Sequence, residues 1–258
     1  MKAAIRTSLS FLAVYGLSLL TAQTCLAGSV HLAVASNFSA PIKQLATEFE
    51  ITSGHTVTLS FGSSGKFYAQ IQHGAPFEIF LSADQAKPAA LEEQGMVVPA
   101  SRFTYAIGTL VLWSSQPDLV DQSSNVLSQQ GFNKLAMANP RVAPYGVAAV
   151  QVLEALNLRQ ATESKWVQGE NIAQTFQFVS SGNADLGFVA LSQVIGIKTG
   201  AQAAGSAWIV PSEYHQPIRQ DAVLLPNAEG NDAAKAFMDF LQGPTARTII
   251  EAYGYKTS

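Results

Sequence analysis

The sequence predicts an α/β protein of two similar lobes, with a ligand cleft between them and two crossover strands joining them. Strands alternate with helices along the chain, as in parallel βαβ units. The segment GAPFEIFL at 74–81 has a counterpart in GNADLGFV at 182–189, each with a helix-stopping glycine, an acidic residue and an apolar strand. A generic helix-to-strand turn has the same features. Two extended stretches, 103–113 and 217–225, suit the two crossovers.

The first 27 residues have the pattern of a cleavable secretory signal. Lys2 and Arg6 precede a short apolar run, and small residues at Cys25 and Ala27 suit cleavage after Ala27. The run is too short for a membrane span, which needs about 20 apolar residues. A lipoprotein signal at Cys25 is less well matched, because no aliphatic residue precedes it. Cleavage after Ala27 removes the chain's one cysteine, so the exported protein is expected to fold without disulfides.

The elements of the remaining chain follow from apolar periodicity. Strands are predicted at 30–35, 56–61, 77–81, 135–138 and 186–190. Helices are expected after turns at 36–39 (with Ser39 as N-cap), 62–65, 139–146 and after Asn171. A C-terminal helix with Phe237 and Leu241 returns to the first lobe. The predicted division is a signal peptide at 1–27, lobe I at 28–105 plus 219–258, and lobe II at 106–218.

Charge and motifs exclude several classes of function. After position 27, 13 basic against 18 acidic residues leave a net charge of −5, with no run of Lys or Arg. That composition argues against nucleic acid and anionic membranes as partners. The four histidines show no metal-ligand spacing, and no G-x-S-x-G is present. Gly65-Lys66 resembles the end of a phosphate loop, but the spacing fails, since Ser60 replaces the first glycine.

Four turns that precede helices are the candidate binding elements. They contain Ser36-Asn37, Ser63-Ser64, Ala143 to Tyr145, and Asn171-Ile172. A helix N-terminus presents unpaired N–H groups and a partial positive charge, and hydroxyls add donors. Two such turns from each lobe would surround a tetrahedral dianion without any ionic partner. Each turn taken alone is also explained as an ordinary helix cap.

Several motifs together resemble the periplasmic molybdate-binding proteins of ABC uptake systems, which have the type II periplasmic binding protein fold. They are AVASNF at 33–38, FGSSGKFYAQI at 61–71, GAPFEIFLSAD at 74–84, PASRFTYAIGTLVLW at 99–113, NPRVAPYGVAA at 139–149, NADLGFVALSQ at 183–193 and GPTARTIIEAYGY at 243–255. The resemblance implies oxyanion ligands at Ser36, Asn37, Ser64, Tyr145 and the backbone N–H of Ile172. Some members have a tyrosine where this chain has Ala190, and a small residue where it has Tyr145.

The resemblance also implies a function. The protein is expected to be a monomeric periplasmic receptor that captures molybdate, and tungstate, and delivers it to the membrane permease of an ABC importer. It is expected to be no enzyme, to need no cofactor and to insert in no membrane once the signal is removed. The alternatives are a receptor for another oxyanion such as sulfate, a secreted hydrolase, and the sensing domain of a regulator. The hydrolase lacks a metal cluster and a nucleophile motif, and the signal peptide argues against the regulator.

Overall fold

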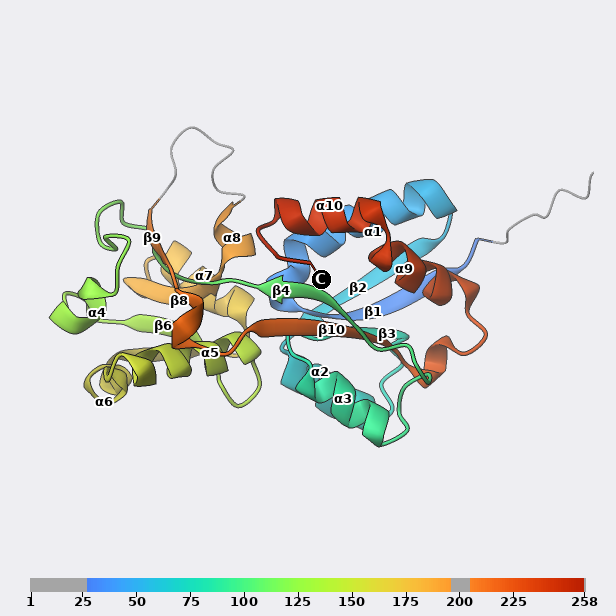
Figure 1. The fold of residues 1–258 in the computed structure, drawn as a ribbon, viewed down its shortest axis with the longest axis horizontal. Coiled ribbons are helices and arrows are strands. Elements are labelled where there is room, and N and C mark those ends of the chain that lie inside the picture. The colour runs from blue at the N-terminus through green and yellow to red at the C-terminus, as the bar shows by residue number, and fades with distance from the viewer. Residues whose placement is uncertain (1–26, 196–204, 258) are drawn as a thin grey trace, which may run out of the picture.

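The computed structural model describes residues 27–195 and 205–257. Two α/β lobes lie side by side along the long axis of the molecule, as Figure 1 shows. Each lobe is built on a five-stranded sheet. The predicted fold class, two similar α/β lobes, is confirmed. The predicted signal peptide falls almost wholly on residues 1–26, which lie outside the described residues.

The sheet of lobe I has the strand order β2-β1-β3-β10-β4. Its strands are β1 (Ser29–Ala35), β2 (Thr56–Gly62), β3 (Ile79–Leu81), β4 (Phe103–Gly108) and β10 (Ile218–Leu224). The first three strands are parallel, whereas β10 is antiparallel to both β3 and β4. The helices of this lobe are η1 (Ser36–Phe38), α1 (Ser39–Ser53), α2 (Ser64–Gln72), α3 (Ala86–Glu93), η5 (Pro226–Ala228), α9 (Asp232–Gln242) and α10 (Pro244–Ala252).

The sheet of lobe II repeats this topology with the order β7-β6-β8-β5-β9. Its strands are β5 (Leu110–Ser114), β6 (Leu135–Ala138), β7 (Trp166–Gly169), β8 (Leu186–Ala190) and β9 (Ser206–Ile209). Again three strands are parallel, and β5 runs antiparallel to β8 and β9. Its helices are α4 (Asn125–Gln129), α5 (Pro144–Ala155), α6 (Arg159–Thr162), η2 (Glu163–Lys165), α7 (Ile172–Ser180), α8 (Leu191–Ile195) and η4 (Ser212–Tyr214).

The chain passes between the lobes twice, as predicted. It leaves lobe I from β4 into β5, and it returns through the segment between β9 and β10. The predicted lobe boundaries at 105/106 and 218/219 lie inside β4 and β10, two strands that pair with each other in the sheet of lobe I. A Cβ atom on Gly108, the last residue of β4, would lie 2.1 Å from the Tyr145 hydroxyl of lobe II. Glycine at this position therefore lets the two lobes meet at the first crossover.

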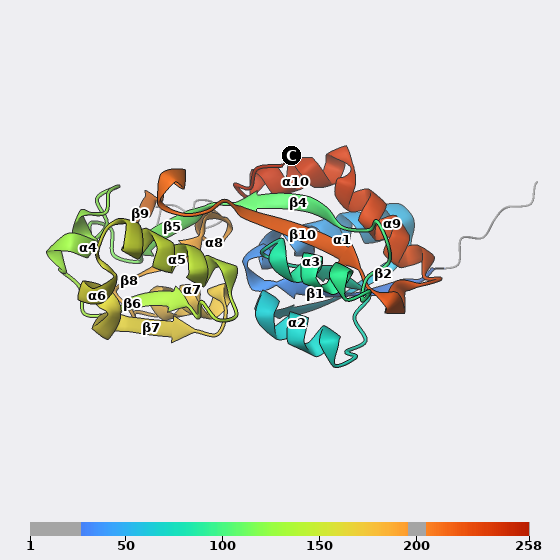
Figure 2. The same cartoon turned by 60° about the horizontal axis from the view of Figure 1, so that its bottom comes forward.

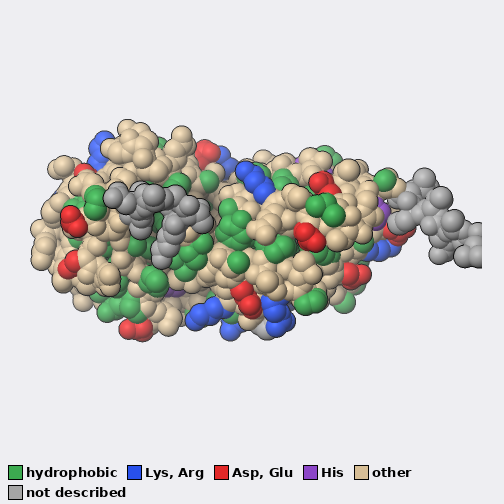
Figure 3. Space-filling view, turned by 90° about the horizontal axis from the view of Figure 1, so that it is seen from above, with side chains coloured by type: hydrophobic (Ala, Val, Ile, Leu, Met, Phe, Trp, Pro, Cys, Tyr) green, Lys and Arg blue, Asp and Glu red, His purple; other side chains and the backbone are tan. Residues whose placement is uncertain are grey.

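Buried apolar side chains fill both lobes. In lobe I, α1, α9 and α10 cover one face of the sheet through residues such as Phe49, Phe237 and Ile250, and α2 and α3 cover the other through Phe67 and Leu91. The core of lobe II lies between its sheet and α5, with a second cluster under α7. No helix within the described ranges is long and apolar enough to cross a membrane. On the face in Figure 3, charged side chains are scattered in small groups of both signs.

Three sequence predictions of local structure need correction. Ser39 is the first residue of α1 and makes no side-chain cap, because the turn before it is the 3₁₀ helix η1. The predicted 139–146 loop is shorter, since α5 begins at Pro144, whose fixed φ suits a first helical turn. The extended stretch 103–113 is divided at Gly108 into two strands that belong to different sheets.

Candidate oxyanion-binding site

A small cavity lies between the lobes, at the carboxyl ends of the parallel strands. Lobe I lines it with Ala35, Ser36, Asn37, Gly62, Ser63 and Ala83, and lobe II with Ala143, Pro144, Tyr145, Asn171 and Ile172. The space that the centre of a water-sized sphere can reach in this cavity is about 10 Å³. Pockets for organic ligands hold roughly 300–1,000 Å³, so this cavity suits only a small ligand. None of the lining residues that the structure describes carries a charge.

Four helix N-termini converge on this cavity. They are those of η1, which follows β1, of α2, which follows β2, of α5, which follows β6, and of α7, which follows β7. The first N–H groups of a helix have no acceptor within the helix, and its N-terminal end carries a partial positive charge. The arrangement therefore attracts an anion with aligned N–H dipoles and without a charged side chain.

The N-terminus of α7 shows which N–H group remains for a ligand. The Asn171 side chain caps the helix, and its Oδ1 accepts hydrogen bonds from the N–H groups of Ala173 and Gln174, both at 3.0 Å. The N–H of Ile172 belongs to the same first turn, and the Asn171 side chain does not accept a hydrogen bond from it. Ile172 lines the cavity and is 3% exposed. The structure thus places the predicted backbone donor at the wall of the cavity.

The two serines of the 62–65 turn have different roles. Ser63 lines the cavity, and its Oγ is 3.4 Å from the N–H of Lys66, which it caps. Ser64 is not among the lining residues, and its Oγ accepts a hydrogen bond of 2.8 Å from the N–H of Ala83. Since that Oγ is the acceptor, its own proton is still available to donate. The resemblance implied Ser64 and not Ser63 as a ligand, and two adjacent serines carry no sequence signal that tells their roles apart.

Tyr145 and Asn37 reach the cavity from opposite lobes. The Tyr145 hydroxyl lies 3.5 Å from Nε2 of Gln220, and burial raises its pKa well above the usual range, so it stays neutral. The Asn37 amide donates to Oε1 of Gln220 at 2.7 Å and to the Tyr255 hydroxyl at 3.0 Å. Both amide protons of Asn37 are therefore used within the protein, whereas the Tyr145 hydroxyl accepts from Gln220 and keeps its own proton. The backbone N–H groups of both residues, in the first turns of η1 and α5, are further donors at the cavity.

Sequence reasoning missed a buried polar cluster behind the cavity. Besides Asn37, it contains Tyr105, Gln220 and Tyr255 from lobe I and Ser192 from lobe II. The Ser192 hydroxyl donates to the carbonyl of Asn37 at 2.8 Å and so connects the lobes. Burial raises the pKa of Tyr255 to about 12, so this hydroxyl stays protonated. The sequence signal that could have indicated this cluster is Gln220, a polar residue within the predicted strand segment PIRQDAVLL.

Ser64→Ala is expected to weaken both binding and folding. It removes a hydroxyl donor beside the cavity, and it leaves the buried N–H of Ala83 without its acceptor. Losing a hydrogen bond to a charged group costs about 1.5–3 kcal/mol, roughly a 10- to 100-fold loss of affinity. Ser63→Ala removes a hydroxyl at the cavity wall and the long 3.4 Å cap contact, but it leaves the Ser64 hydroxyl and its bond to Ala83 in place, so it is expected to cost less. Calorimetry with oxyanions and thermal unfolding measure the two effects. A greater loss of binding in Ser63→Ala would show that Ser63 supplies the hydroxyl.

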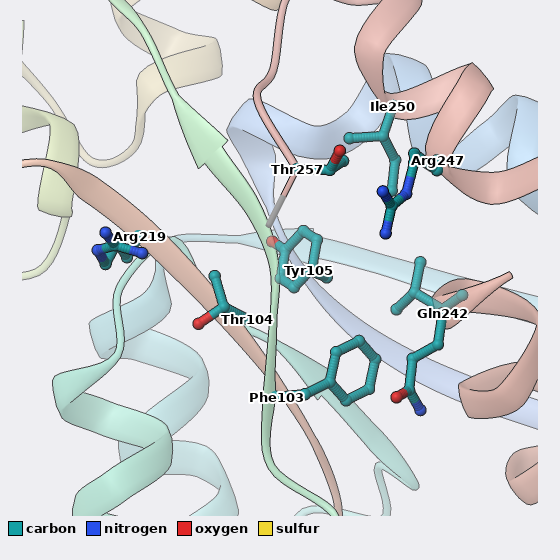
Figure 4. Close-up of a pocket in the computed structure, with 9 residues that line it drawn as sticks. Phe103, Thr104, Tyr105, Arg219, Gln242, Arg247, Ile250 and Thr257 are labelled. Carbon is teal, nitrogen blue, oxygen red and sulfur yellow. The ribbon is translucent and has the colours of Figure 1, made fainter. Parts of the chain in front are cut away.

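A second hollow, on the outside of lobe I, is a weaker candidate. It is lined by Phe103, Thr104, Tyr105, Arg219, Leu241, Gln242, Arg247, Ile250 and Thr257. Figure 4 shows Arg219 and Arg247 on opposite sides of β4. Both arginines are exposed to solvent. The guanidinium groups do not converge on one point, whereas the helix N-termini at the cavity between the lobes do.

Two lobes joined by two crossovers, with a small uncharged cavity at their junction, define a solute-binding protein. The chain belongs to the family of bacterial extracellular solute-binding proteins, whose model matches residues 30–256. It is 55% identical to the molybdate-binding protein ModA of Azotobacter vinelandii over 229 residues, covering 89% of this chain and 90% of that one. It is 49% identical to ModA of Rhodobacter capsulatus over 231 residues, covering 90% and 89%.

A solved structure agrees with these relatives. The periplasmic molybdate-binding protein of Azotobacter vinelandii superposes with a TM-score of 0.85 at 43% identity, covering 89% of this chain and 99% of that chain. The resemblance that the sequence motifs indicated is therefore confirmed. These relatives are named as binding proteins, and the expectation that this chain is a binding protein and no enzyme is confirmed with them.

Proposed function

We propose that this protein captures molybdate, and also tungstate, in the periplasm and delivers it to the permease of an ABC importer. The supporting observation is the set of uncharged donors that helix N-termini from both lobes direct at one small cavity. The names of the relatives support molybdate as the ligand. Binding requires no cofactor, and the protein acts as a monomer.

Ser36, Asn37, Ser64, Tyr145 and Ile172 hold the anion in this proposal. Asn37, Tyr145 and Ile172 donate through backbone N–H groups, and Ser36 and Ser64 add hydroxyls. All of these groups are donors. Molybdate is fully ionised near neutral pH and accepts hydrogen bonds only, so it matches the site. Phosphate keeps a proton there and needs an acceptor, and no carboxylate lines the cavity. Glu170, the carboxylate next to the fourth turn, is paired with Lys66 at 2.7 Å.

Sulfate is the second candidate, because it is also a dianion that only accepts hydrogen bonds. It is smaller than molybdate, so it would lie farther from donors placed for the larger ion. A secreted hydrolase is not supported, since the described residues contain no group of three or more His, Cys, Asp or Glu that could hold a metal ion. The relatives named as molybdate-binding proteins favour the larger anion.

Oxyanions that bind the site should raise the thermal stability of the protein, and oxyanions that do not bind should leave it unchanged. A ligand that binds only the folded state stabilises it by about 2.7 kcal/mol at a hundredfold excess over Kd. We expect molybdate and tungstate to raise Tm accordingly, and phosphate to leave it unchanged. Calorimetry on refolded, ligand-free protein with molybdate, tungstate, sulfate and phosphate measures the ranking. Displacement of molybdate by an equal concentration of phosphate, or a Tm that molybdate leaves unchanged, would contradict the proposal.

A further inference from the structure

We infer that Gly65 controls closure of the two lobes, as the centre of a clasp formed by Gly65 and Lys66 of lobe I with Val142 and Glu170 of lobe II. This inference rests on the proposed function and goes beyond it, because Gly65 is not among the residues that line the cavity. Gly65 acts through closure, as a positioning residue that keeps donors of both lobes around the anion.

The first observation is a backbone hydrogen bond between the lobes. The N–H of Gly65 donates to the carbonyl of Val142 at 2.8 Å. Val142 itself lies in the short loop between β6 and α5, one residue before the lining residue Ala143. The bond therefore joins the turn that opens α2 directly to the turn that opens α5, and both turns bound the cavity.

The second observation is steric. A Cβ atom on Gly65 would lie 2.8 Å from Cα and 2.9 Å from the carbonyl oxygen of Val142. These are backbone atoms, so no side-chain rotation relieves the overlap. The φ angle of Gly65 is not in the left-handed region, and the backbone of lobe I therefore accepts any residue there. Close approach of the opposite lobe is what requires glycine at this position.

The third observation is an ion pair beside the hydrogen bond. Nζ of Lys66 is 2.7 Å from Oε2 of Glu170, and these side chains are 47% and 63% exposed. An exposed pair contributes little and is screened by salt. The ion pair therefore adds little to closure, whereas the contact of Gly65 with Val142 sets how closely the lobes approach.

The clasp lies on the side of the cavity away from the crossovers. In Figure 2, β4 and β10 run along the upper side of the molecule, and α2 and β7 lie on its lower side. Lys66 belongs to α2, and Glu170 directly follows β7. Contacts far from the hinge separate most when two lobes rotate apart. The clasp therefore breaks early in opening, and the release of the anion depends on it.

The test is Gly65→Ala, with Gly131→Ala as the matched control. A Cβ atom on Gly131 meets nothing within 4 Å, and its φ is not in the left-handed region. Alanine favours helix over glycine, and Gly65 is the second residue of α2, so ligand-free Gly65→Ala should keep or raise its Tm. We expect its affinity for molybdate to fall at least tenfold through faster dissociation, with small-angle scattering showing a more open molecule. Gly131→Ala should match the wild type in both.

Two outcomes would overturn the inference. One is Gly65→Ala that binds molybdate within twofold of the wild type and scatters identically. The other concerns Glu170→Gln, which removes only the exposed ion pair. The inference is wrong if this variant loses more affinity for molybdate at physiological salt than Gly65→Ala does. A failure of the proposed function can be distinguished from a failure of this inference, because small-angle scattering on the ligand-free protein requires no ligand. If the wild type binds no oxyanion, a larger radius of gyration of ligand-free Gly65→Ala still supports the clasp, and an equal radius rejects it.

Discussion

Asn171→Asp is expected to lower the affinity for molybdate by about a hundredfold or more, while the ligand-free protein stays as stable as before. Asn171 lines the cavity and caps α7 through its Oδ1. Aspartate is an equally good N-cap, and its charge interacts favourably with the helix N-terminus. The same charge repels a dianion. Two unit charges ~8 Å apart repel by about 2 kcal/mol at an effective dielectric constant of ~20, and a dianion doubles that energy.

The opposite signs of the two effects make this result specific. Calorimetry measures the affinity, and thermal unfolding without ligand measures the stability. Asn171→Ser, a neutral cap, is the control and should keep most of the affinity. If Asn171→Asp bound molybdate as well as Asn171→Ser, the anion would not lie in this cavity. If it lost stability without ligand, the loss of binding would have to be attributed to misfolding of α7.

Ile172→Pro is expected to reduce affinity by roughly 10- to 100-fold, because it removes the N–H that we assign to the anion. A hydrogen bond to a charged group is worth about 1.5–3 kcal/mol. The backbone tolerates this substitution. Ile172 is the first residue of α7, where proline is common, and Asn171 has the extended φ of −150° and ψ of 173° that suit a residue before proline. Calorimetry with molybdate again gives the measurement.

The control separates the lost donor from the lost side chain. Ile172 is buried in the core of lobe II, so its replacement also costs packing. Ile172→Ala loses at least as much packing and keeps the N–H, and it should bind molybdate within a few-fold of the wild type. Equal losses in Ile172→Pro and Ile172→Ala would show that the side chain, and not the N–H, matters at this position.

Much of the fold could be predicted because apolar periodicity follows directly from burial. The predicted strands 135–138 and 186–190 coincide with β6 and β8, and the helix after Asn171 is α7. Strands β7 and β9 were missed. The β7 segment WVQG has one buried residue, and β9 alternates buried with more exposed positions over only four residues. Short edge strands depend on their partner for pairing and leave little pattern in the sequence.

The candidate site was predicted in part. Ser36, Asn37, Tyr145 and Ile172 all line the cavity, although the two from lobe I are more than 100 residues away in the chain from the two of lobe II. Each stands where a strand ends and a helix begins, and that local signal is readable. Ser64 is adjacent to the cavity without lining it. Which atom of each residue faces the ligand was not readable, since the Asn37 amide and the Tyr145 hydroxyl are bound by Gln220, 183 and 75 residues away.

The sequence by itself determined most of the elements, their approximate order in two lobes and the four helix N-termini that supply donors. These properties depend on neighbouring residues, through periodicity, capping and turn chemistry. The tertiary structure alone decided which lobe surfaces touch. Glycine at 65 has an unremarkable local conformation, and only its approach to Val142 gives a reason for it. The polar cluster around Gln220 joins residues from both lobes and the C-terminal segment. Such contacts join residues that are far apart in the chain, so no pattern among neighbouring residues predicts them.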